Sequence, residues 1–389
     1  MPTNKTFIGI DLGTTRCCAA IYRSNGIVDI IPLGNTGDKL IPSYVSFDQK
    51  IGGEISSSTI FDIKRILGKQ YTEIVKDNNW NFNIIKHKNR VKIQYESDTG
   101  FIEKYPEEIS ADLLKHINQK IGNDSVEVVI TVPAAFNSEQ KNATRAAALL
   151  AGFTNGIHLL SEPIAASFAH FSAAATNSEM IQKDSTFLLL DLGGGTLDVC
   201  IFKVSNNQLK EICKNGDPNL GGRNFDNLLI KYFSQELRDK FGINVPGNRK
   251  HEFLQEIQNI KHNLTEKTED ELSFIDEDNL TNKVSITQED FEKLSIELLK
   301  TIEINIMTAL ENCKHTPNQI NKVLYVGGGC RMPMIKKLLK SIFPQAQHCD
   351  KENPDEVVAK GAAYYAYYLN IPAKENYVNS SNNSSCSLM

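Results

Sequence analysis

One short pattern occurs twice in this chain and constrains its fold more than any other feature. In each copy an aspartate, a leucine, and then glycines and threonines lie between two β-rich runs. The first copy is Asp11-Leu12-Gly13-Thr14-Thr15, between residues 7–10 and 17–22, and the second is Asp191-Leu192-Gly193-Gly194-Gly195-Thr196, between residues 187–190 and 197–204. Each unit therefore reads as a strand, a glycine turn and a strand. Because the unit recurs about half a chain apart, we expect a duplicated α/β fold with two lobes.

Glycine turns of this kind are suited to binding phosphate. Without a Cβ, their backbone N–H groups can approach an anion closely. Asp11 and Asp191 can hold a cation against that anion, so two facing turns could grip one polyphosphate from both sides. A third turn, residues 327–329, follows the β-rich run 322–326 and precedes Arg331. The alternative is three unrelated turns, since Asp and Gly are common in ordinary turns.

Length and composition agree with two lobes and exclude a few classes of protein. A chain of 389 residues is too long for one simple core. Its net charge of -5 gives no reason to expect nucleic acid as a partner. No apolar run approaches the ~20 residues of a membrane helix, and the N-terminal residues do not resemble a secretory signal. Eight cysteines without a CxxC pair argue against zinc or a disulfide framework and favour a reducing cytoplasm.

The glycine turns belong to a longer series of motifs, in one order from about Thr6 to Leu369. The motifs are residues 9–15, 61–68, 132–137, 161–166, 190–199, 220–226, 326–333 and 353–363. With them the chain resembles the ATPase domain of the 70-kilodalton heat-shock chaperone family, within the actin and sugar-kinase superfamily. The segments 61–68, 132–137 and 220–226 resemble the chaperones rather than actin or the kinases. The resemblance implies an actin-like ATPase fold, in which two duplicated, ribonuclease-H-like lobes surround a central nucleotide cleft.

The expected layout follows from the duplication. It places a first lobe at 1–184, a second lobe at 185–372 with a helical insert at 225–311, and a disordered tail at 373–389. Strand-like runs at 271–275 and 283–286 interrupt the insert, and 172–184 reads as a surface loop. The pattern 137–152 predicts a helix that Asn137 caps. A second helix should begin at an Asn353 cap, and its small residues 361–363 would let two helices cross closely.

The resemblance implies ATP or ADP, Mg²⁺ and also K⁺ as ligands. Lys64 matches the family's catalytic lysine, which faces the γ-phosphate and positions the attacking water; the alternative is a solvated surface lysine. Thr196 can donate its hydroxyl to a phosphate oxygen. The expected metal-binding and catalytic carboxylates, acting mostly through water, are Asp11, Glu162, Asp191 and Asp198. For Glu162 the alternative is a residue that merely precedes Pro163 at a helix start.

The remaining predicted nucleotide contacts come from all three glycine turns, from one helix of the insert and from the motifs at 220–226 and 353–363. They are Gly13, Thr14, Thr15, Arg16, Gly193, Gly194, Gly195, Gly221, Gly222, Gln258, Lys261, His262, Thr265, Gly327, Gly328, Gly329, Arg331 and Asp355. Arg331 should stack on the adenine by its guanidinium plane. Among these contacts, Gln258 and His262 depart from the family, which usually has Glu and Arg there, and this bears on nucleotide affinity more than on hydrolysis. Arg16 also departs, because the family commonly has Tyr at that position.

Three functions remain open at this point. The first is an ATPase whose lobe closure gates a partner surface, as a chaperone or co-chaperone regulator in protein folding. Its partners would be J-domain proteins, nucleotide exchange factors or another chaperone. We expect it to lack the family's peptide-binding domain, because only a polar tail follows residue 372. The second is a scaffold or binding module that holds ATP without hydrolysing it, and the third is a small-molecule kinase of the same superfamily.

The last four residues bear on localisation. We expect a cytoplasmic protein, but Cys386-Ser387-Leu388-Met389 fits a prenylation box, and a terminal Met favours farnesyl. A single lipid without a polybasic run gives only weak, reversible membrane binding. The alternative is a chance cysteine near the terminus.

Overall fold

The structure is a computed structural model of the chain. It describes residues 6–46, 51–53, 58–97, 100–122, 126–154, 156–176, 185–205, 208–275, 280–349 and 353–370. The predicted tail at 373–389, with Cys386, lies outside the described residues.

The first half of the chain forms a mixed sheet around the first glycine turn. Its strands are β1 (Thr6–Leu12), β2 (Arg16–Tyr22), β3 (Val28–Ile30), β10 (Val126–Val132) and β11 (Ile157–Ser161), in the order β11-β10-β1-β2-β3, with β4 (Leu40–Pro42) also pairing with β2. The hairpin strands β1 and β2 are antiparallel, and β1 and β10 are parallel. The glycine turn is therefore built into the sheet, because it joins the neighbouring strands β1 and β2.

The second half repeats this sheet. Its strands are β12 (Ser185–Leu192), β13 (Leu197–Ser205), β14 (Gln208–Asp217), β17 (Lys322–Val326) and β18 (Gln347–Cys349), in the order β14-β13-β12-β17-β18. Again the glycine turn joins two antiparallel strands, and the first of them pairs in parallel with a later strand. Strand order and direction match the first sheet one for one. The predicted duplication of an α/β unit is confirmed.

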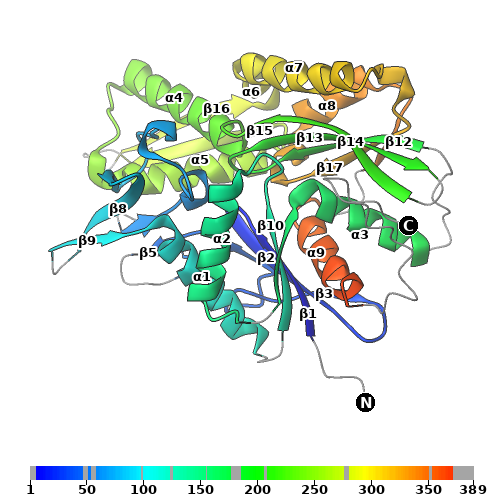
Figure 1. Ribbon diagram of the computed structural model, residues 1–389. Coiled ribbons are helices and arrows are strands. Elements are labelled where there is room, and N and C mark those ends of the chain that lie inside the picture. The colour runs from blue at the N-terminus through cyan, green and yellow to red at the C-terminus, as the bar shows by residue number, and fades with distance from the viewer. Residues whose placement is uncertain are drawn as a thin grey trace.

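The helices repeat as well. In the first half they are α1 (Pro106–Ile121), α2 (Ser138–Leu150) and α3 (Glu162–Thr176); in the second they are α7 (Ile296–Asn312), α8 (Pro333–Ile342) and α9 (Val357–Tyr368). Helices α3 and α9 cross between the two sheets (Figure 1), and α9 packs on β1, β2 and β10. A Cβ on Gly361 would overlap the backbone carbonyl of Ala165. The predicted close crossing at the small residues of α9 is thus confirmed.

The two helix starts that the sequence predicts differ in outcome. Asn137 caps α2 with a reciprocal capping box, because its side chain accepts from Gln140 N at 2.9 Å and its own N donates to Gln140 Oε1 at 3.2 Å. Asn353 instead caps a turn, accepting from Asp355 N at 3.1 Å, and α9 begins only at Val357. The loop predicted from residue 172 is wrong for residues 172–176, which belong to α3.

Further elements complete each half. The first carries β5 (Val45–Ser46), β6 (Thr59–Ile60), the 3₁₀ turns η1 (Ile63–Arg65) and η2 (Tyr71–Glu73), and a sheet of β7 (Asn83–His87), β8 (Arg90–Ser97) and β9 (Gly100–Lys104). The second carries α4 (Gly222–Phe241), η3 (Gly247–Arg249), α5 (Lys250–Asn263), β15 (Glu269–Ile275), β16 (Thr281–Thr287), α6 (Gln288–Leu294), η4 (Pro317–Gln319) and η5 (Gly328–Arg331). The paired strands β15 and β16 confirm the two strand-like runs predicted inside the insert.

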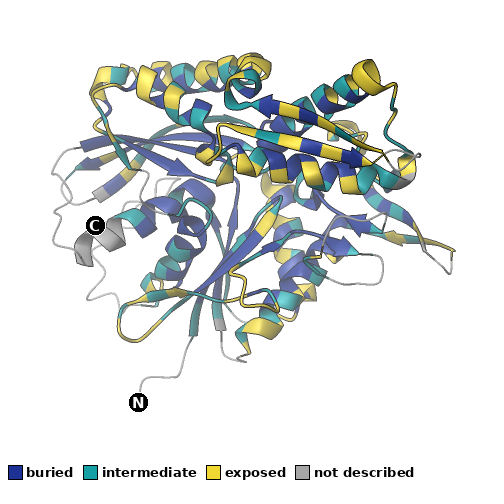
Figure 2. Cartoon of the chain, turned by 180° about the vertical axis from the view of Figure 1, so that it is seen from behind, coloured by how far each residue is buried: buried dark blue, intermediate teal, exposed yellow. Residues whose placement is uncertain are grey.

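The core lies along both sheets, whose central strands are dark blue in Figure 2. Every residue of β12 is buried, because the strand is covered on both faces. Cys17 and Cys18 are both buried and point to opposite sides of β2: Cys17 packs in the first core, and Cys18 packs against α9. Among the described helices, none combines the length and the apolar character that crossing a bilayer requires.

Candidate functional site

The two glycine hairpins meet across the space between the sheets. A Cβ on Gly194 would overlap the side chain of Thr15, and a Cβ on Gly195 would lie 3.0 Å from Thr14 Cγ2. Only glycine leaves room for this approach. Segments about half a chain apart in the sequence therefore face each other, as the repeated pattern predicts.

Neighbouring residues hold each hairpin by its carbonyl oxygens. Ser43 donates its N–H to Thr15 O at 2.8 Å and its hydroxyl to Gly13 O at 2.7 Å. On the second hairpin, Gly222 N donates to Gly193 O at 2.8 Å. Among the described residues, none accepts a hydrogen bond from the backbone N–H of Thr14, Thr15, Gly194 or Gly195. The carbonyls are engaged and the donors remain free, which is the polarity that an anion needs.

A cavity of about 910 Å³ opens over the hairpins and is lined from both halves of the chain. Most of the predicted site residues line it. They are Asp11, Gly13, Thr14, Thr15, Arg16, Lys64, Glu162, Asp191, Gly193, Gly194, Thr196, Gly222, Gln258, Lys261, His262, Thr265, Gly327, Gly328, Gly329, Arg331 and Asp355. Three predicted residues, Gly195, Gly221 and Asp198, are not among the residues that line it. A Cβ on Gly221 would sit 2.5 Å from Gly195 N, so these two glycines pack on each other. Asp198 is buried directly opposite Asp191 in the β12–β13 ladder, so its side chain lies on the same face of the sheet as that lining residue.

Buried carboxylates surround one lysine at the closed end of the cavity. Lys64 Nζ lies 2.5 Å from Glu162 Oε1, and both side chains are less than a tenth exposed. Burial, together with the charge of Glu162, raises the pKa of Asp11 to about 7, and the same two causes raise that of Asp198 to about 7. Burial and neighbouring carboxylates hold the pKa of Asp191 well above its ordinary value. Among the described residues the cluster thus holds more carboxyl groups than Lys64 can balance as anions, and part of it is protonated near pH 7.

Lys64 stays protonated in this cluster. Burial alone would lower the pKa of its ammonium group, but the charges of Glu162 and Asp11 outweigh burial and raise it. One carboxylate oxygen of this cluster has no hydrogen-bond donor. Among the described residues no donor reaches Asp198 Oδ2, although the atom is buried. An unpartnered buried carboxylate oxygen beside further carboxylates fits a cation at this end of the cavity.

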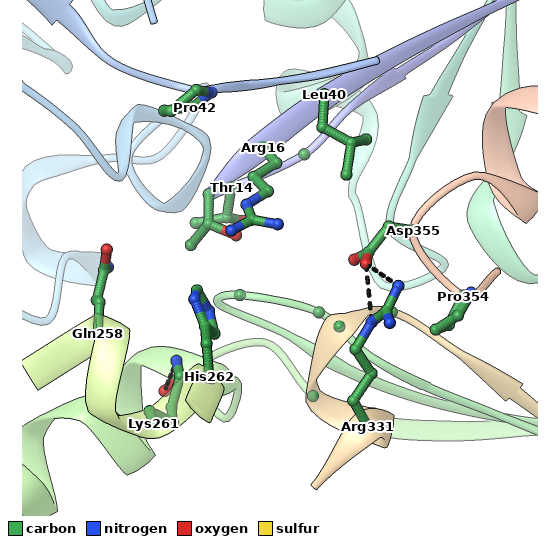
Figure 3. A pocket seen from close by; sticks show the side chains of 18 of the residues that line it. Thr14, Arg16, Leu40, Pro42, Gln258, Lys261, His262, Arg331, Pro354 and Asp355 are labelled. Atoms are coloured by element: carbon green, nitrogen blue, oxygen red, sulfur yellow. Dashed lines mark hydrogen bonds and ion pairs between the residues drawn. The ribbon is translucent and has the colours of Figure 1, made fainter. Parts of the chain in front are cut away.

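The open end of the cavity has a different character (Figure 3). Arg331, which ends η5, donates Nε and Nη2 to Asp355 Oδ2 at 3.0 and 2.7 Å, and its side chain is 44% exposed. From α5, His262 points toward Arg16 and Thr14 of the opposite wall. Desolvation in the cleft, with the charges of Lys261 and Arg16, lowers the pKa of His262 to about 4, so the ring is neutral at pH 7.

Comparison with known proteins assigns the chain to a family. A family model of Hsp70 proteins matches residues 7–376. The chain belongs to the Hsp70 family. It is similar to a ribosome-associated molecular chaperone of Eremothecium gossypii, at 32% identity over 93% of this chain and 61% of the relative, and to one of Saccharomyces cerevisiae, at 32% over 92% and 60%. The chain thus spans about three fifths of the length of these relatives. Its two duplicated sheets are those of the actin-like ATPase fold that the family implies.

Several lining residues of this Hsp70-family chain escaped the sequence analysis. They are Leu40, Pro42, Tyr44, Gly52, Gly53, Gln255, Asn259, Asn263, Glu266, Lys267, Met332, Pro354 and Val358. Helical spacing carried a usable signal for two of them, because Gln255 and Asn259 share the face of α5 that presents Gln258 and His262. Tyr44 had no such signal. Its hydroxyl donates to Gln258 Oε1 at 3.2 Å from the opposite wall, and 214 residues separate the pair.

Proposed function

We propose that this Hsp70-family chain binds ATP with Mg²⁺ between its two glycine hairpins and hydrolyses it, and that the nucleotide controls a chaperone or co-chaperone activity. One observation carries the proposal. Two hairpins with free backbone donors face each other beside a buried cluster of one lysine and several carboxylates.

The cavity suits a nucleoside triphosphate. A volume of about 910 Å³ lies at the upper end of the range for ligand pockets. The free N–H groups of Thr14, Thr15 and Gly194, which line the cavity, would bind phosphate oxygens. The second hairpin's Thr196 would add a hydroxyl. At the open end, Arg331 and Asp355 would position the nucleoside, with Gln258, Lys261, His262 and Thr265 on the facing wall.

The carboxylates would hold Mg²⁺ mostly through water. Among the described residues, no three His, Cys, Asp or Glu side chains gather closely enough to enclose a metal. Mg²⁺ retains several of its waters in such sites, so Asp11, Glu162, Asp191 and Asp198 can act from a distance, and the unpartnered Asp198 Oδ2 offers an acceptor. When bound, Mg²⁺ neutralises charge on the β- and γ-phosphates. K⁺ remains a prediction of the family resemblance.

The chain's own groups would supply orientation and a proton acceptor. The Lys64 ammonium has three donors and spends one on Glu162 at 2.5 Å, which leaves two for a γ-phosphate oxygen and an attacking water. Asp198, with a pKa of about 7, can accept a proton from that water near neutral pH. Rate acceleration would come chiefly from positioning and charge stabilisation.

A specific contact also supports a second candidate. If Lys64 stays on Glu162 when ATP is bound, the chain would hold ATP as a binding module without turning it over. The wider role rests on the relatives, which are named as ribosome-associated molecular chaperones. They support a cytoplasmic protein with partners of the chaperone cycle, namely J-domain proteins, nucleotide exchange factors or another chaperone.

A single-turnover assay separates the two candidates. With chain in excess over ATP and Mg²⁺, we expect phosphate release from the wild type without any added acceptor, and a rate about 10²–10³-fold lower for Lys64→Ala. Lys337→Ala is the matched control, because Lys337 is an exposed lysine of α8 away from the cavity, and it should match the wild type. A wild type that binds MgATP but releases no phosphate would leave only the binding module.

A further inference from the structure

One buried arginine connects the two halves of the molecule beside the cavity. Arg223, near the start of α4, is only 4% exposed. Its backbone N donates to Gly194 O of the second glycine hairpin at 2.8 Å. Its guanidinium reaches the first half of the chain, where Nη2 lies 2.9 Å from Asp62 Oδ1 and Nε lies 3.2 Å from Asp62 Oδ2. The same residue therefore contacts a phosphate hairpin with its backbone and the opposite lobe with its side chain.

The acceptor of this fork lies two residues before Lys64. Asp62 is fully buried and adopts a left-handed backbone conformation with φ of 60° and ψ of 20°. That conformation is uncommon outside glycine and persists where the surroundings enforce it. Asp62 immediately precedes η1, the short turn that carries Lys64, and its carbonyl accepts from Arg65 N at 2.9 Å. The direction of η1, and with it the reach of Lys64 to Glu162, depends on how Asp62 is held.

Weaker contacts also reach the Asp62 carboxylate. Trp80 Nε1 donates to Oδ2 at 3.3 Å, and an Arg65 nitrogen lies 3.9 Å away. The two bonds from Arg223 are the better aligned restraint, because a planar fork fixes orientation as well as distance. The network continues to the cavity wall, since Arg223 also lies 3.4 Å from Asp226, which pairs with Lys261 at 2.6 Å. Arg65 also lies 3.8 Å from Asp77. Three cations, Arg65, Arg223 and Lys261, thus face the three carboxylates of Asp62, Asp77 and Asp226, so the Arg223–Asp62 pair can persist without solvent.

We propose that Arg223 is a positioning residue for ATP hydrolysis: it ties the Asp62 turn to the second glycine hairpin and so sets Lys64 in register with the γ-phosphate. The inference rests on the proposed hydrolysis. In this arrangement Lys64, which belongs to the first lobe, takes its place only while the second lobe is closed over it. Arg223 then positions both the second glycine hairpin and Lys64, so the two lobes do not position them independently.

Two variants test the tie, and a third controls for the substitution. Arg223→Lys keeps the charge and loses the fork, and Asp62→Asn removes the acceptor charge while keeping a residue that tolerates the left-handed conformation. Arg238→Lys is the control, because it makes the same arginine-to-lysine change on the same helix, at a residue that donates to Asn244 Oδ1 in an exposed position. Thermal melts establish that each variant is folded.

Two readouts are measured on all four chains. The first is the single-turnover rate at saturating MgATP, with the ATP dissociation constant measured separately. The second needs no hydrolysis: the rate at which a succinimidyl ester acylates Lys64, followed by peptide mass spectrometry. We expect Arg223→Lys and Asp62→Asn to lower the rate about 10²-fold, with the dissociation constant changed by less than about threefold, because small misplacements cost this much. Lys64 should be acylated at least about fivefold faster, since its ammonium is now less firmly held on Glu162.

The outcomes distinguish this inference from the proposed function. If Lys64 is acylated faster in both variants but the wild type never hydrolyses ATP, the contact between Arg223 and Asp62 positions Lys64 as inferred, and the hydrolysis proposal is wrong. Unchanged acylation would overturn the tie, whether the turnover rate falls or not, because Arg223 would then act elsewhere. Arg238→Lys should match the wild type in both readouts.

Discussion

The two ends of the cavity are built in different ways. At the phosphate end, backbone groups of duplicated hairpins form the surface, and buried carboxylates surround Lys64. At the nucleoside end, side chains form the surface, and the most prominent of them, Arg331, is 44% exposed. A wall made of backbone follows from the fold itself and tolerates little change. A wall made of exposed side chains can be altered one residue at a time. Arg16, Gln258 and His262, at which the resemblance predicts departures from the family, line the cavity.

The largest expected contrast comes from the same substitution at each end. In Gly221→Ala the new Cβ would lie 2.5 Å from Gly195 N and 2.7 Å from Gly194 C, and backbone cannot move aside cheaply. We expect a loss of about 1–3 kcal/mol in the free energy of unfolding. In Gly328→Ala the nearest atom is Asp355 Oδ1 at 2.9 Å, the end of a side chain that can turn away, so the loss should stay below about 1 kcal/mol. Urea unfolding of both variants measures the difference, and equal losses would remove the contrast.

The pH dependence should also come from the phosphate end. The pKa values of Asp11 and Asp198 are raised from 3.8 to about 7, so their contribution to stability is complete below pH 4 and is lost as the pH rises through 7. Binding of Mg²⁺ needs the charged carboxylates, so the affinity for Mg²⁺ should increase as the pH rises through the same range. We expect the MgATP-induced rise in melting temperature to be larger at pH 8 than at pH 6, with affinity up to about tenfold higher per carboxylate and pH unit. A shift that is flat or falls with pH would contradict the carboxylate assignment.

The smallest effect is expected at the nucleoside end. His262→Ala should weaken ATP binding by roughly threefold through lost contact with the base, and leave the turnover rate at saturation unchanged. Because the pKa of His262 is lowered to about 4, the ring is neutral throughout pH 6–8. The ratio of the ATP affinities of the wild type and His262→Ala should therefore stay constant over that range. Fluorescence titration at three pH values tests this. A ratio that grows as the pH falls would show that the ring binds as a cation.

The same contrast explains what could be predicted from the sequence. The hairpins, the strand at 322–326 and the Asn137 capping box are local patterns, and the structure confirms them where they were expected. The loop predicted from residue 172 failed because the alanines at 173–175 favour helix, so α3 continues to Thr176. The contacts between lobes carried no local signal: Asp62 and Arg223 are 161 residues apart, and Tyr44 and Gln258 are 214 apart.

The central claim is that both hairpins bind a single triphosphate, and calorimetric titration with MgATP tests it most directly. The wild type should bind one ATP per chain. In Gly194→Ala the new Cβ would push against Thr15, so the hairpins must separate and affinity should fall by at least about 30-fold. Gly247→Ala, where a Cβ meets no atom within 4 Å among the described residues, should bind like the wild type. Equal binding by Gly194→Ala, or no binding by the wild type, would contradict the account.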